Sequence, residues 1–325
     1  MMVERLERGP EHLAIIVPAY NESENLEALI ARITSAMDKA SVYEIVIVDD
    51  GSRDESASLL PDLASRYPQM GYVVLASNVG QQNALRAGLG AVEADCYVFL
   101  DADLQHPPEL IEQLVARWRE GFDVVNAIRR RDRRTPIFKR TTSAFFYRFL
   151  SWLSGYRLET GSSDFRLIDR KVAERLKAMP EVDIFYRGLI PQMGVASANV
   201  AYQPDPRHAG RSKYSYTAML RLALRGVLSS TVKPLRLAIV FAIATASAAG
   251  AFLLYVLFQR FFGDGTVAGW ASTLTVVLII GAMQLLVLGV IGEYLGQVLK
   301  ETRRRPPYIV ERTRLARLKG TPDDA

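Results

Sequence analysis

Short apolar runs alternate with helix-like stretches through the first 130 residues of the chain. The apolar runs predict strands at residues 13–17, 44–48, 72–75, 96–100 and 123–128. Between them, residue spacing and composition predict helices that include residues 23–33, 81–92 and 108–120. Continuously apolar strands that alternate with helices are typical of parallel sheets covered on both faces. The pattern therefore predicts an α/β domain with a doubly wound, mostly parallel sheet.

Polar residues after the first two strands predict where the next helices begin. Pro18 is expected to end the first strand, and Asn21 or Ser23 to cap the helix that follows. Ser52 is expected to cap the second helix, with Glu55 three residues later as in a capping box.

The pattern changes after residue 235, where two long runs without charged residues occur. These runs are Leu237–Phe258 and Trp270–Gly292. Both exceed the roughly 20 apolar residues with which a helix crosses the hydrocarbon core of a bilayer. Two buried core helices are the alternative, which this length disfavours. Cations lie outside both runs, at 233 and 236 and at 300–305, so the positive-inside rule predicts cytoplasmic flanks.

Two further segments carry membrane-surface or packing patterns. Residues 214–228 alternate Leu and Met with Arg221 and Arg225, as in an amphipathic helix lying on a bilayer. Residues 141–153 repeat aromatic side chains at helical spacing, which favours packing or membrane-surface contacts. The predicted organisation is an α/β domain at 1–212, amphipathic juxtamembrane helices at 213–234, two transmembrane helices at 235–295 and a basic cytoplasmic tail at 296–325.

Composition narrows the classes of partner. Of the 325 residues, 49% are hydrophobic, and the net charge is +5. A basic balance of this size favours phosphates or anionic lipid as partners, rather than nucleic acid specifically. Cys96 is the single cysteine and lies in a predicted strand, which excludes a disulfide framework and a cysteine-based metal site.

The most informative chemistry follows the strand at 96–100. Asp101 and Asp103 come directly after it, followed by Gln105 and a Pro-Pro break. Ligands of open α/β sheets bind at the carboxyl ends of the strands. Carboxylates there favour a hard divalent cation, Mg²⁺ or Mn²⁺, which commonly shares its oxygen ligands with substrate phosphates. Two solvated aspartates are the alternative, because a lone D-x-D is a short motif.

Three later segments combine charge with small or polar residues. Residues 129–134 are densely basic, which fits either a phosphate-binding loop or an ordinary solvated loop. Residues 161–167 and 207–214 have a composition suited to loops that close over phosphate. His106 and His208 flank these motifs and are interpreted as incidental polar loop residues.

Six motifs taken together resemble family 2 glycosyltransferases of the GT-A fold. They are Val17–Glu22, Val48–Ser52, Asn78–Gln81, Asp101–Pro108, Asp164–Leu167 and Ser212–Tyr214. More narrowly, the chain resembles the polyprenyl-phosphate branch, which includes dolichol-phosphate mannosyltransferases and bacterial undecaprenyl-phosphate glycosyltransferases. The C-terminal hairpin, with Gly292–Gly296 and Arg305–Tyr308, is also similar to the bacterial members. The resemblance extends over roughly 15–308, and the order and spacing of the motifs make it specific.

The resemblance implies a role for each matching residue. The residues that match donor-binding positions are Pro18, Tyr20, Glu22, Asp50, Ala102 and Asp103. The residues that match metal and diphosphate positions are Asp101, Asp103 and Gln105. Those implied in catalysis and phosphate binding are Asp103, Asp164, Arg129, Arg207 and Lys213. Arg130 and Lys139 match, with Arg129, the family's basic loop on the donor and acceptor phosphates. Two positions depart from the family pattern: Ser163 stands where glycine is usual, and Arg211 where an acidic or small residue is common.

The implied reaction moves a sugar, with inversion at C1, from a nucleotide sugar to polyprenyl phosphate, with Mg²⁺ or Mn²⁺ as cofactor. Glucose from UDP-glucose is the predicted donor, and GDP-mannose or another nucleotide sugar is the alternative. The implied setting is a bacterial inner membrane, with membrane lipids as partners, the catalytic domain and both termini cytoplasmic, and a homo-oligomer such as a tetramer.

Two other classes of protein are weighed against this one. A processive polysaccharide synthase would be expected to carry Gln-x-x-Arg-Trp, whereas Gln113 here is followed by three residues before Arg117-Trp118. A membrane nucleotide-sensing scaffold would not need the carboxylates, Gln105 and the distal cations together. Both alternatives are therefore less consistent with the sequence than an enzyme.

Overall fold

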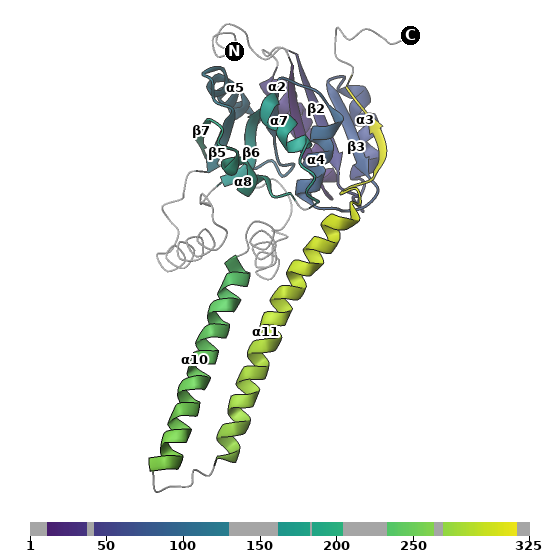
Figure 1. Ribbon diagram of the computed structural model, residues 1–325. Coiled ribbons are helices and arrows are strands. Elements are labelled where there is room, and N and C mark those ends of the chain that lie inside the picture. Colours follow the sequence, from purple (N-terminus) through teal and green to yellow (C-terminus); the bar gives the residue numbers. More distant parts are fainter. Residues whose placement is uncertain are drawn as a thin grey trace. The chain divides into compact units, whose positions relative to one another are not determined.

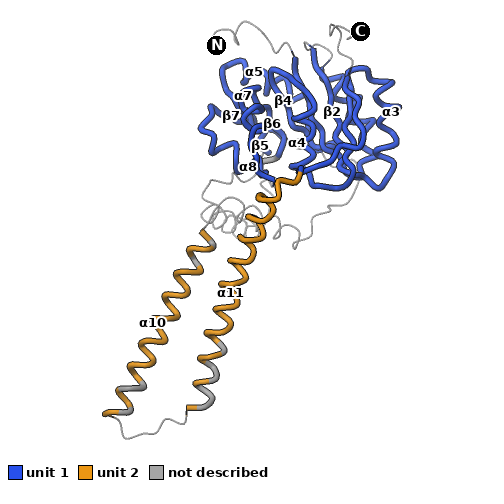
Figure 2. Tube along the Cα trace, turned by 45° about the vertical axis from the view of Figure 1, so that its right-hand side comes forward, with its two compact units in different colours: residues 1–148, 156–215, 306–325 blue, residues 149–155, 216–305 orange. Residues whose placement is uncertain are grey.

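The computed structural model describes residues 12–37, 42–129, 162–182, 184–203, 233–262 and 269–316 (Figure 1). The chain divides into two compact units (Figure 2). Unit 1 contains residues 1–148, 156–215 and 306–325, and unit 2 contains residues 149–155 and 216–305.

Unit 1 is built on an eight-stranded sheet in the order β7-β5-β6-β4-β1-β2-β3-β8. The strands are β1 Leu13–Ala19, β2 Tyr43–Asp49, β3 Met70–Leu75, β4 Cys96–Phe99, β5 Val124–Arg129, β6 Ser162–Asp169, β7 Ser197–Tyr202 and β8 Val310–Arg314. β4, β1, β2 and β3 pair in parallel, as do β5 and β7. β6 runs antiparallel to β4 and β5, and β8 antiparallel to β3. The predicted α/β fold with a mostly parallel sheet is confirmed.

The central strands are buried along their whole length. Every residue of β1, β2 and β3 is buried, which accounts for the apolar runs in all three strands; β2 also buries Glu44 and Asp49 near its ends. Pro18 was expected to end β1 but lies inside it, opposite Val48 of β2. The ladder between β1 and β4 stops at Ile16, so the missing N–H of Pro18 falls beyond the last pair on that side.

Helices cover both faces of the sheet (Figure 1). The helices of unit 1 are α2 Ser23–Ala36, α3 Ser56–Arg66, α4 Gln81–Ala91, η1 Pro108–Leu110, α5 Ile111–Arg119, α7 Arg170–Lys177, α8 Tyr186–Leu189 and η2 Ile190–Met193. Apolar residues of α2, α3 and α5 form one core with Leu13, Ile15 and Val17 of β1. Those of α4, α7 and α8 form the second core with Ala14 and Ile16. The alternation of β1 side chains thus places one core on each face.

Both predicted helix caps are wrong. Glu22 and Glu55 occupy the N-cap positions of α2 and α3, and neither makes a side-chain capping hydrogen bond. The Ser52 hydroxyl instead accepts a hydrogen bond from Asn21 N–H at 2.9 Å. The Ser56 hydroxyl accepts one from Glu22 N–H at 3.0 Å. Ser52, before α3, and Ser56, its first residue, therefore both accept from backbone N–H groups that precede α2, and Ser52 does not cap α3.

Two segments that the sequence assigned to loop or tail are strands. Residues 162–167, predicted as a loop, belong to β6, which fills the space between β4 and β5. Residues 310–314 lie in the predicted tail but form β8 at the edge of the sheet. The Ile309 carbonyl also accepts a hydrogen bond from Ala76 N–H at 2.9 Å, next to the first residues after β3.

Unit 2 contains two long helices, α10 Lys233–Phe262 and α11 Trp270–Arg303. Both contain windows long and apolar enough to cross a membrane, with mean hydropathies of 2.0 and 1.7. Only 6% and 0% of these windows are buried. A core helix of a soluble protein would be mostly buried, so this exposure favours the membrane interpretation. The predicted regions at 129–134, 141–153 and 207–228 lie outside the described residues, apart from Arg129.

Candidate functional site

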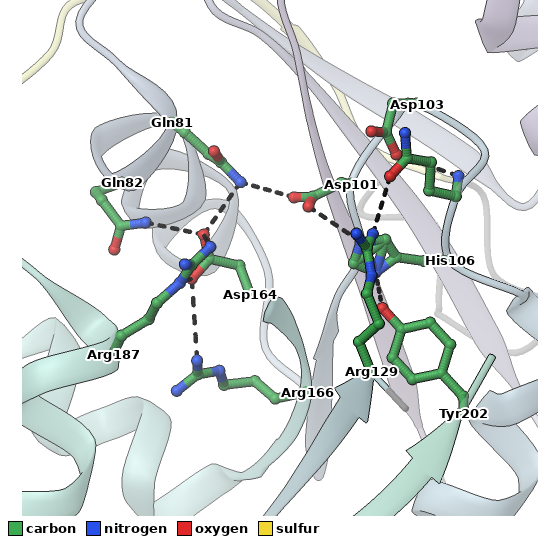
Figure 3. A network of polar contacts seen from close by, with 11 residues as sticks. Gln81, Gln82, Asp101, Asp103, His106, Arg129, Asp164, Arg166, Arg187 and Tyr202 are labelled. Carbon is green, nitrogen blue, oxygen red and sulfur yellow. Dashed lines mark hydrogen bonds and ion pairs between the residues drawn. The ribbon is translucent and has the colours of Figure 1, made fainter. Parts of the chain in front are cut away.

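Asp101 follows β4 and sits between the side chains of Gln81 and His106 (Figure 3). Its Oδ1 accepts a hydrogen bond from Gln81 Nε2 at 2.6 Å. Its Oδ2 lies 3.3 Å from His106 Nε2, and 26% of the side chain is exposed. Burial, followed by the charges of Asp164 and Asp103, raises the pKa of Asp101 to about 7. The carboxylate is thus oriented from both sides at a place where negative charge is costly.

Gln105 connects the loop after β4 to the end of β5. Its side-chain oxygen accepts a hydrogen bond from Arg129 Nη2 at 2.9 Å. Its backbone N–H donates to Asp103 Oδ1 at 3.2 Å. Arg129 is the last residue of β5, so the basic run begins directly beside the two carboxylates. The structure therefore brings together Asp101, Asp103, Gln105 and Arg129, as the resemblance implied.

Asp164 anchors a second polar cluster, shown in Figure 3. Arg187 donates to both its oxygens, through Nε at 2.7 Å and Nη2 at 2.9 Å. Gln81 and Gln82 donate to Oδ2 at 3.2 and 3.3 Å. Arg166 lies 3.9 Å away. Gln81 Nε2 therefore contacts Asp101 and Asp164 at once and links the two clusters.

The Asp164 cluster has an electrostatic balance opposite to that around Asp101. Burial by itself would raise the pKa of Asp164, but the charge and hydrogen bonds of Arg187 hold that pKa below its ordinary value. Burial lowers the pKa of Arg166 to about 10, against the opposing effect of Asp164. The Asp164 side chain is only 4% exposed. In this arrangement Asp164 holds Arg187 and the two glutamines in place.

Asp50 organises the loop between β3 and α4. Its Oδ1 accepts from Val79 N–H at 2.7 Å, and its Oδ2 from Gly80 N–H and the Asn78 side chain, each at 2.9 Å. Burial raises the pKa of Asp50, while the Val79 and Gly80 hydrogen bonds oppose this effect. Gly80 has φ +90°, a conformation that side chains rarely adopt. The geometry thus gives Asp50 a structural task beside the donor contact that the resemblance implied.

The remaining predicted donor residues lie around the same edge of the sheet. Pro18 is in β1, and Tyr20 and Glu22 follow it, both half-buried. Glu22 Oε2 accepts a hydrogen bond from Asn25 Nδ2 at 2.6 Å. Ala102 is 4% exposed and belongs to the core beside Asp101. Arg207 and Lys213 lie outside the described residues.

Several residues at the site were given no functional role from the sequence, although three of them, Gln81, His106 and Arg166, lie within the matched motifs. The full set is Gln81, Gln82, His106, Arg166, Arg187 and Tyr202. The position of Gln81, after β3 and at the start of α4, could have identified it as a site residue, because the ends of the strands meet at the ligand-binding edge of the sheet. Arg187 lies in the four-residue helix α8 and had no such signal.

The donor set around Asp101 and Asp103 fits a divalent cation that is completed by substrate. Within the described ranges, no three or more His, Cys, Asp or Glu side chains form a group that could hold a metal. Mg²⁺ is usually held by one or two carboxylates together with substrate phosphates, rather than by a protein cage. Asp101 and Asp103 are such a set, because burial and the neighbouring carboxylates make negative charge at Asp101 costly unless a cation binds.

A glycosyltransferase family matches the half of the chain that contains this site. The model for glycosyl transferase family 2 matches residues 14–177, which include β1 to β6. The chain belongs to this family and is a glycosyltransferase. A solved structure of glucosyl-3-phosphoglycerate synthase from Mycobacterium tuberculosis, in complex with Mn²⁺, UDP and phosphoglyceric acid, has a similar fold. It is 21% identical, with a TM-score of 0.50 over 71% of this chain and 82% of that one.

Relatives extend the similarity beyond the family domain. "Uncharacterized glycosyltransferase YkcC" of Bacillus subtilis is 36% identical over 92% of this chain and 93% of its own length. "Prophage bactoprenol glucosyl transferase homolog" of Escherichia coli is 33% identical, covering 93% and 99%. "Bactoprenol glucosyl transferase" of Shigella phage SfII is 32% identical, covering 93% and 98%. The similarity therefore includes the region of the two apolar helices.

Proposed function

We propose that this protein transfers glucose from UDP-glucose to a polyprenyl phosphate, with inversion at C1, on the cytoplasmic side of a bacterial inner membrane. The observation that carries the proposal is the link between Asp101 and Asp164 through Gln81 Nε2. It joins Asp101, assigned to the metal and the donor diphosphate, to Asp164, for which we propose a role in orienting the acceptor or the sugar hydroxyls. The full-length similarity to relatives named bactoprenol glucosyl transferase supports the substrate class.

The proposed reaction is one displacement. An oxygen of the acceptor phosphate forms a bond to C1 of the sugar, and the bond from C1 to the nucleoside diphosphate breaks. The acceptor is already anionic at neutral pH, since the second pKa of a phosphate monoester is about 6. It therefore needs orientation more than it needs a base, and we assign that orientation to the region around Asp164 and Arg187.

The charge of the leaving diphosphate must be neutralised as it develops. Asp101 and Asp103 would hold Mg²⁺ or Mn²⁺, which when bound would neutralise part of that charge. Gln105 joins the metal ligand set in this proposal and also accepts from Arg129. Arg129, Arg207 and Lys213 are proposed to contact the phosphates. Pro18, Tyr20, Glu22, Asp50 and Ala102 are proposed to surround the nucleotide.

The two apolar helices are proposed to span the membrane as a hairpin. Lys233 and Arg236 precede the first span, and the cations at 300–305 follow the second, which supports cytoplasmic ends. A cytoplasmic active site would meet nucleotide sugars where they are made and a lipid phosphate at the bilayer surface. A homo-oligomer, with a tetramer as one form, remains part of the proposal.

Purified full-length protein in detergent provides the test. It would be given undecaprenyl phosphate and Mn²⁺ with one labelled donor at a time: UDP-glucose, UDP-galactose, GDP-mannose or UDP-N-acetylglucosamine. Mass spectrometry of the lipid product is expected to show a hexosyl phosphate lipid with UDP-glucose only. Product with GDP-mannose alone would support the alternative donor. Nucleotide binding with no lipid product from any donor would support the scaffold instead.

A further inference from the structure

His106 lies beside the proposed metal site and contacts a partner through each ring nitrogen (Figure 3). Only 3% of the residue is exposed. Nε2 lies 3.3 Å from Asp101 Oδ2, and Nδ1 lies 3.5 Å from the hydroxyl of Tyr202. This burial does not fit the interpretation of His106 as an incidental loop residue.

Two aromatic rings restrict the orientation of the imidazole. Phe165 of β6 meets His106 edge to face, with ring centroids 5.3 Å apart. Tyr202 of β7 lies with its ring centroid 5.7 Å away. Rings at these separations pack favourably in such geometries. The histidine plane is therefore set by residues from two strands that follow it in the chain.

The contacts of the two ring nitrogens suit one tautomer of this histidine when Asp101 is ionised. An ionised carboxylate only accepts hydrogen bonds, so toward it Nε2 is the nitrogen that carries the hydrogen. In a neutral imidazole Nδ1 is then an acceptor, and the Tyr202 hydroxyl can donate to it. Tyr202, His106 and Asp101 thus lie in a row, with the Tyr202 hydroxyl 3.5 Å from Nδ1 and Nε2 3.3 Å from Asp101 Oδ2.

Strand register explains why Tyr202 is available for this contact. Arg129 of β5 and Tyr202 of β7 are direct partners in the parallel ladder. Arg129 donates to Gln105, and Tyr202 contacts His106, the next residue of the loop. The end of this ladder therefore holds two consecutive residues of the loop that carries Asp101 and Asp103.

We infer that His106, oriented by Tyr202, is a positioning residue that sets the rotation of the Asp101 carboxylate for binding of the divalent metal. The inference rests on the proposed function. Gln81 holds the other oxygen of Asp101, so the carboxylate is fixed at both ends and keeps its exposed edge for a ligand. Residues that orient a metal ligand commonly contribute about 10–100-fold to metal affinity.

The test measures Mn²⁺ binding to purified full-length protein by electron paramagnetic resonance, without donor or acceptor. His106→Asn shortens the side chain so that it no longer reaches Asp101, and should weaken Mn²⁺ binding at least about tenfold. His106→Gln, which keeps a donor near the position of Nε2, should recover part of this loss. Tyr202→Phe should weaken binding by a smaller factor. Turnover of His106→Asn should rise toward that of the wild type at high Mn²⁺.

Tyr97→Phe is the matched control, because it also removes a buried tyrosine hydroxyl. This hydroxyl accepts a hydrogen bond from Ala94 N–H at 2.9 Å, and Tyr97 belongs to the core on the other face of the sheet. It should leave Mn²⁺ affinity unchanged. Wild-type affinity in both His106→Asn and Tyr202→Phe would overturn the inference. If His106→Asn does not fold, Tyr202→Phe decides alone. Equal Mn²⁺ binding by the wild type and Asp103→Asn would instead refute the proposed metal site itself.

Discussion

Asp101 and Asp164 show how neighbours give one residue type two different properties. Both lie at the same edge of the sheet and both contact Gln81 Nε2. Asp164 has Arg187 on both oxygens, which holds its pKa below the ordinary value in spite of burial. Asp101 has an amide donor and an imidazole contact but, among the described residues, no bidentate cation, and its pKa rises to about 7. Asp164 is thus neutralised by the Arg187 side chain, whereas Asp101 is suited to a metal cation that binds together with the substrate.

Asp103→Asn should abolish transfer while leaving the fold intact, because it removes the charge of a proposed metal ligand. We expect turnover to fall at least a hundredfold, equivalent to about 2.7 kcal/mol. Product formation by mass spectrometry and thermal unfolding would be measured side by side. Asp62→Asn, which removes a 70% exposed carboxylate on α3, is the control and should change neither. Full activity of the wild type in EDTA would contradict the metal requirement.

His12 should make the stability of unit 1 depend on pH. His12 directly precedes β1, and Glu44 is the second residue of β2. His12 Nε2 lies 3.1 Å from Glu44 Oε1, but the angle of this contact is poor for a hydrogen bond. The Glu44 contact raises the pKa of His12 against the effect of burial, with smaller contributions from Glu93 and Asp95.

Because the folded-state pKa is raised, the stabilisation by His12 is complete below the unfolded pKa of about 6.5 and is lost as pH rises through the folded value. As the pH rises from about 6 to above the folded-state pKa of His12, the melting temperature of the wild type should therefore fall relative to that of His12→Gln. Glu44→Gln should remove the same pH dependence. A constant difference between wild type and His12→Gln over this range would show that the pair contributes no such linkage.

Helix α4 shows how an element places functional residues through close packing. It starts at Gln81 and carries Gln81 and Gln82 to the site. Its Gly88 faces the sheet, where an added Cβ would collide with the Ile16 side chain and lie 2.8 Å from Val48 Cγ2. Glycine therefore lets the helix approach β1 and β2 closely. This distance sets where the two amides stand relative to Asp101 and Asp164.

Gly88→Ala should destabilise the protein by about 1–3 kcal/mol, as overpacking of a core does. It should also lower turnover, because displacement of α4 moves Gln81 away from its two partners. Gly90→Ala, two residues along the same helix, is the matched control. Among the described residues its Cβ would meet only the Tyr308 hydroxyl, at 3.2 Å, which a shift of a few tenths of an ångström would relieve. Thermal unfolding should therefore separate the two variants, and equal melting temperatures would argue against close packing at Gly88.

At the scale of the whole molecule, the chain returns to the sheet after its two apolar helices. β8 adds to β3, and Ile309 pairs with Ala76 just before the loop that Asp50 organises. Residues 306–325 thus belong to the same compact unit as the site, although 90 residues of the other unit precede them at 216–305. The segment after the second apolar helix is therefore a part of the glycosyltransferase domain.

The membrane topology can be tested with single cysteines in a Cys96→Ala background. A cysteine placed at residues 263–265, between the two apolar helices, should react with an impermeant thiol reagent added outside the cell. A cysteine at Thr321 should react only after the membrane is opened. Labelling of the Thr321 position in intact cells would reverse the proposed orientation. Equal labelling of both positions would contradict a membrane-spanning hairpin.

The sequence alone determined the features that have a local or periodic signature. Continuous apolar runs predicted five strands of the sheet, and uncharged runs predicted both long helices. The carboxylates after β4 were found because strand ends form the ligand edge of such sheets. The strand and helix predictions succeeded because each depends on neighbouring residues and on hydrophobic burial, which a sequence displays directly.

Only the tertiary structure decided which distant residues meet. Tyr202 contacts His106 across 96 positions, and Thr313 contacts Tyr72 across 241. The mixed polarity of 162–167 suggested a loop, yet antiparallel pairing with β4 and β5 makes it a strand and buries Asp164 against Arg187. Pairing partners, strand register and the charge balance of a buried cluster depend on contacts between segments far apart in the chain. Such contacts leave no pattern in either segment alone, because each polar residue is stabilised by a partner that the local sequence does not contain.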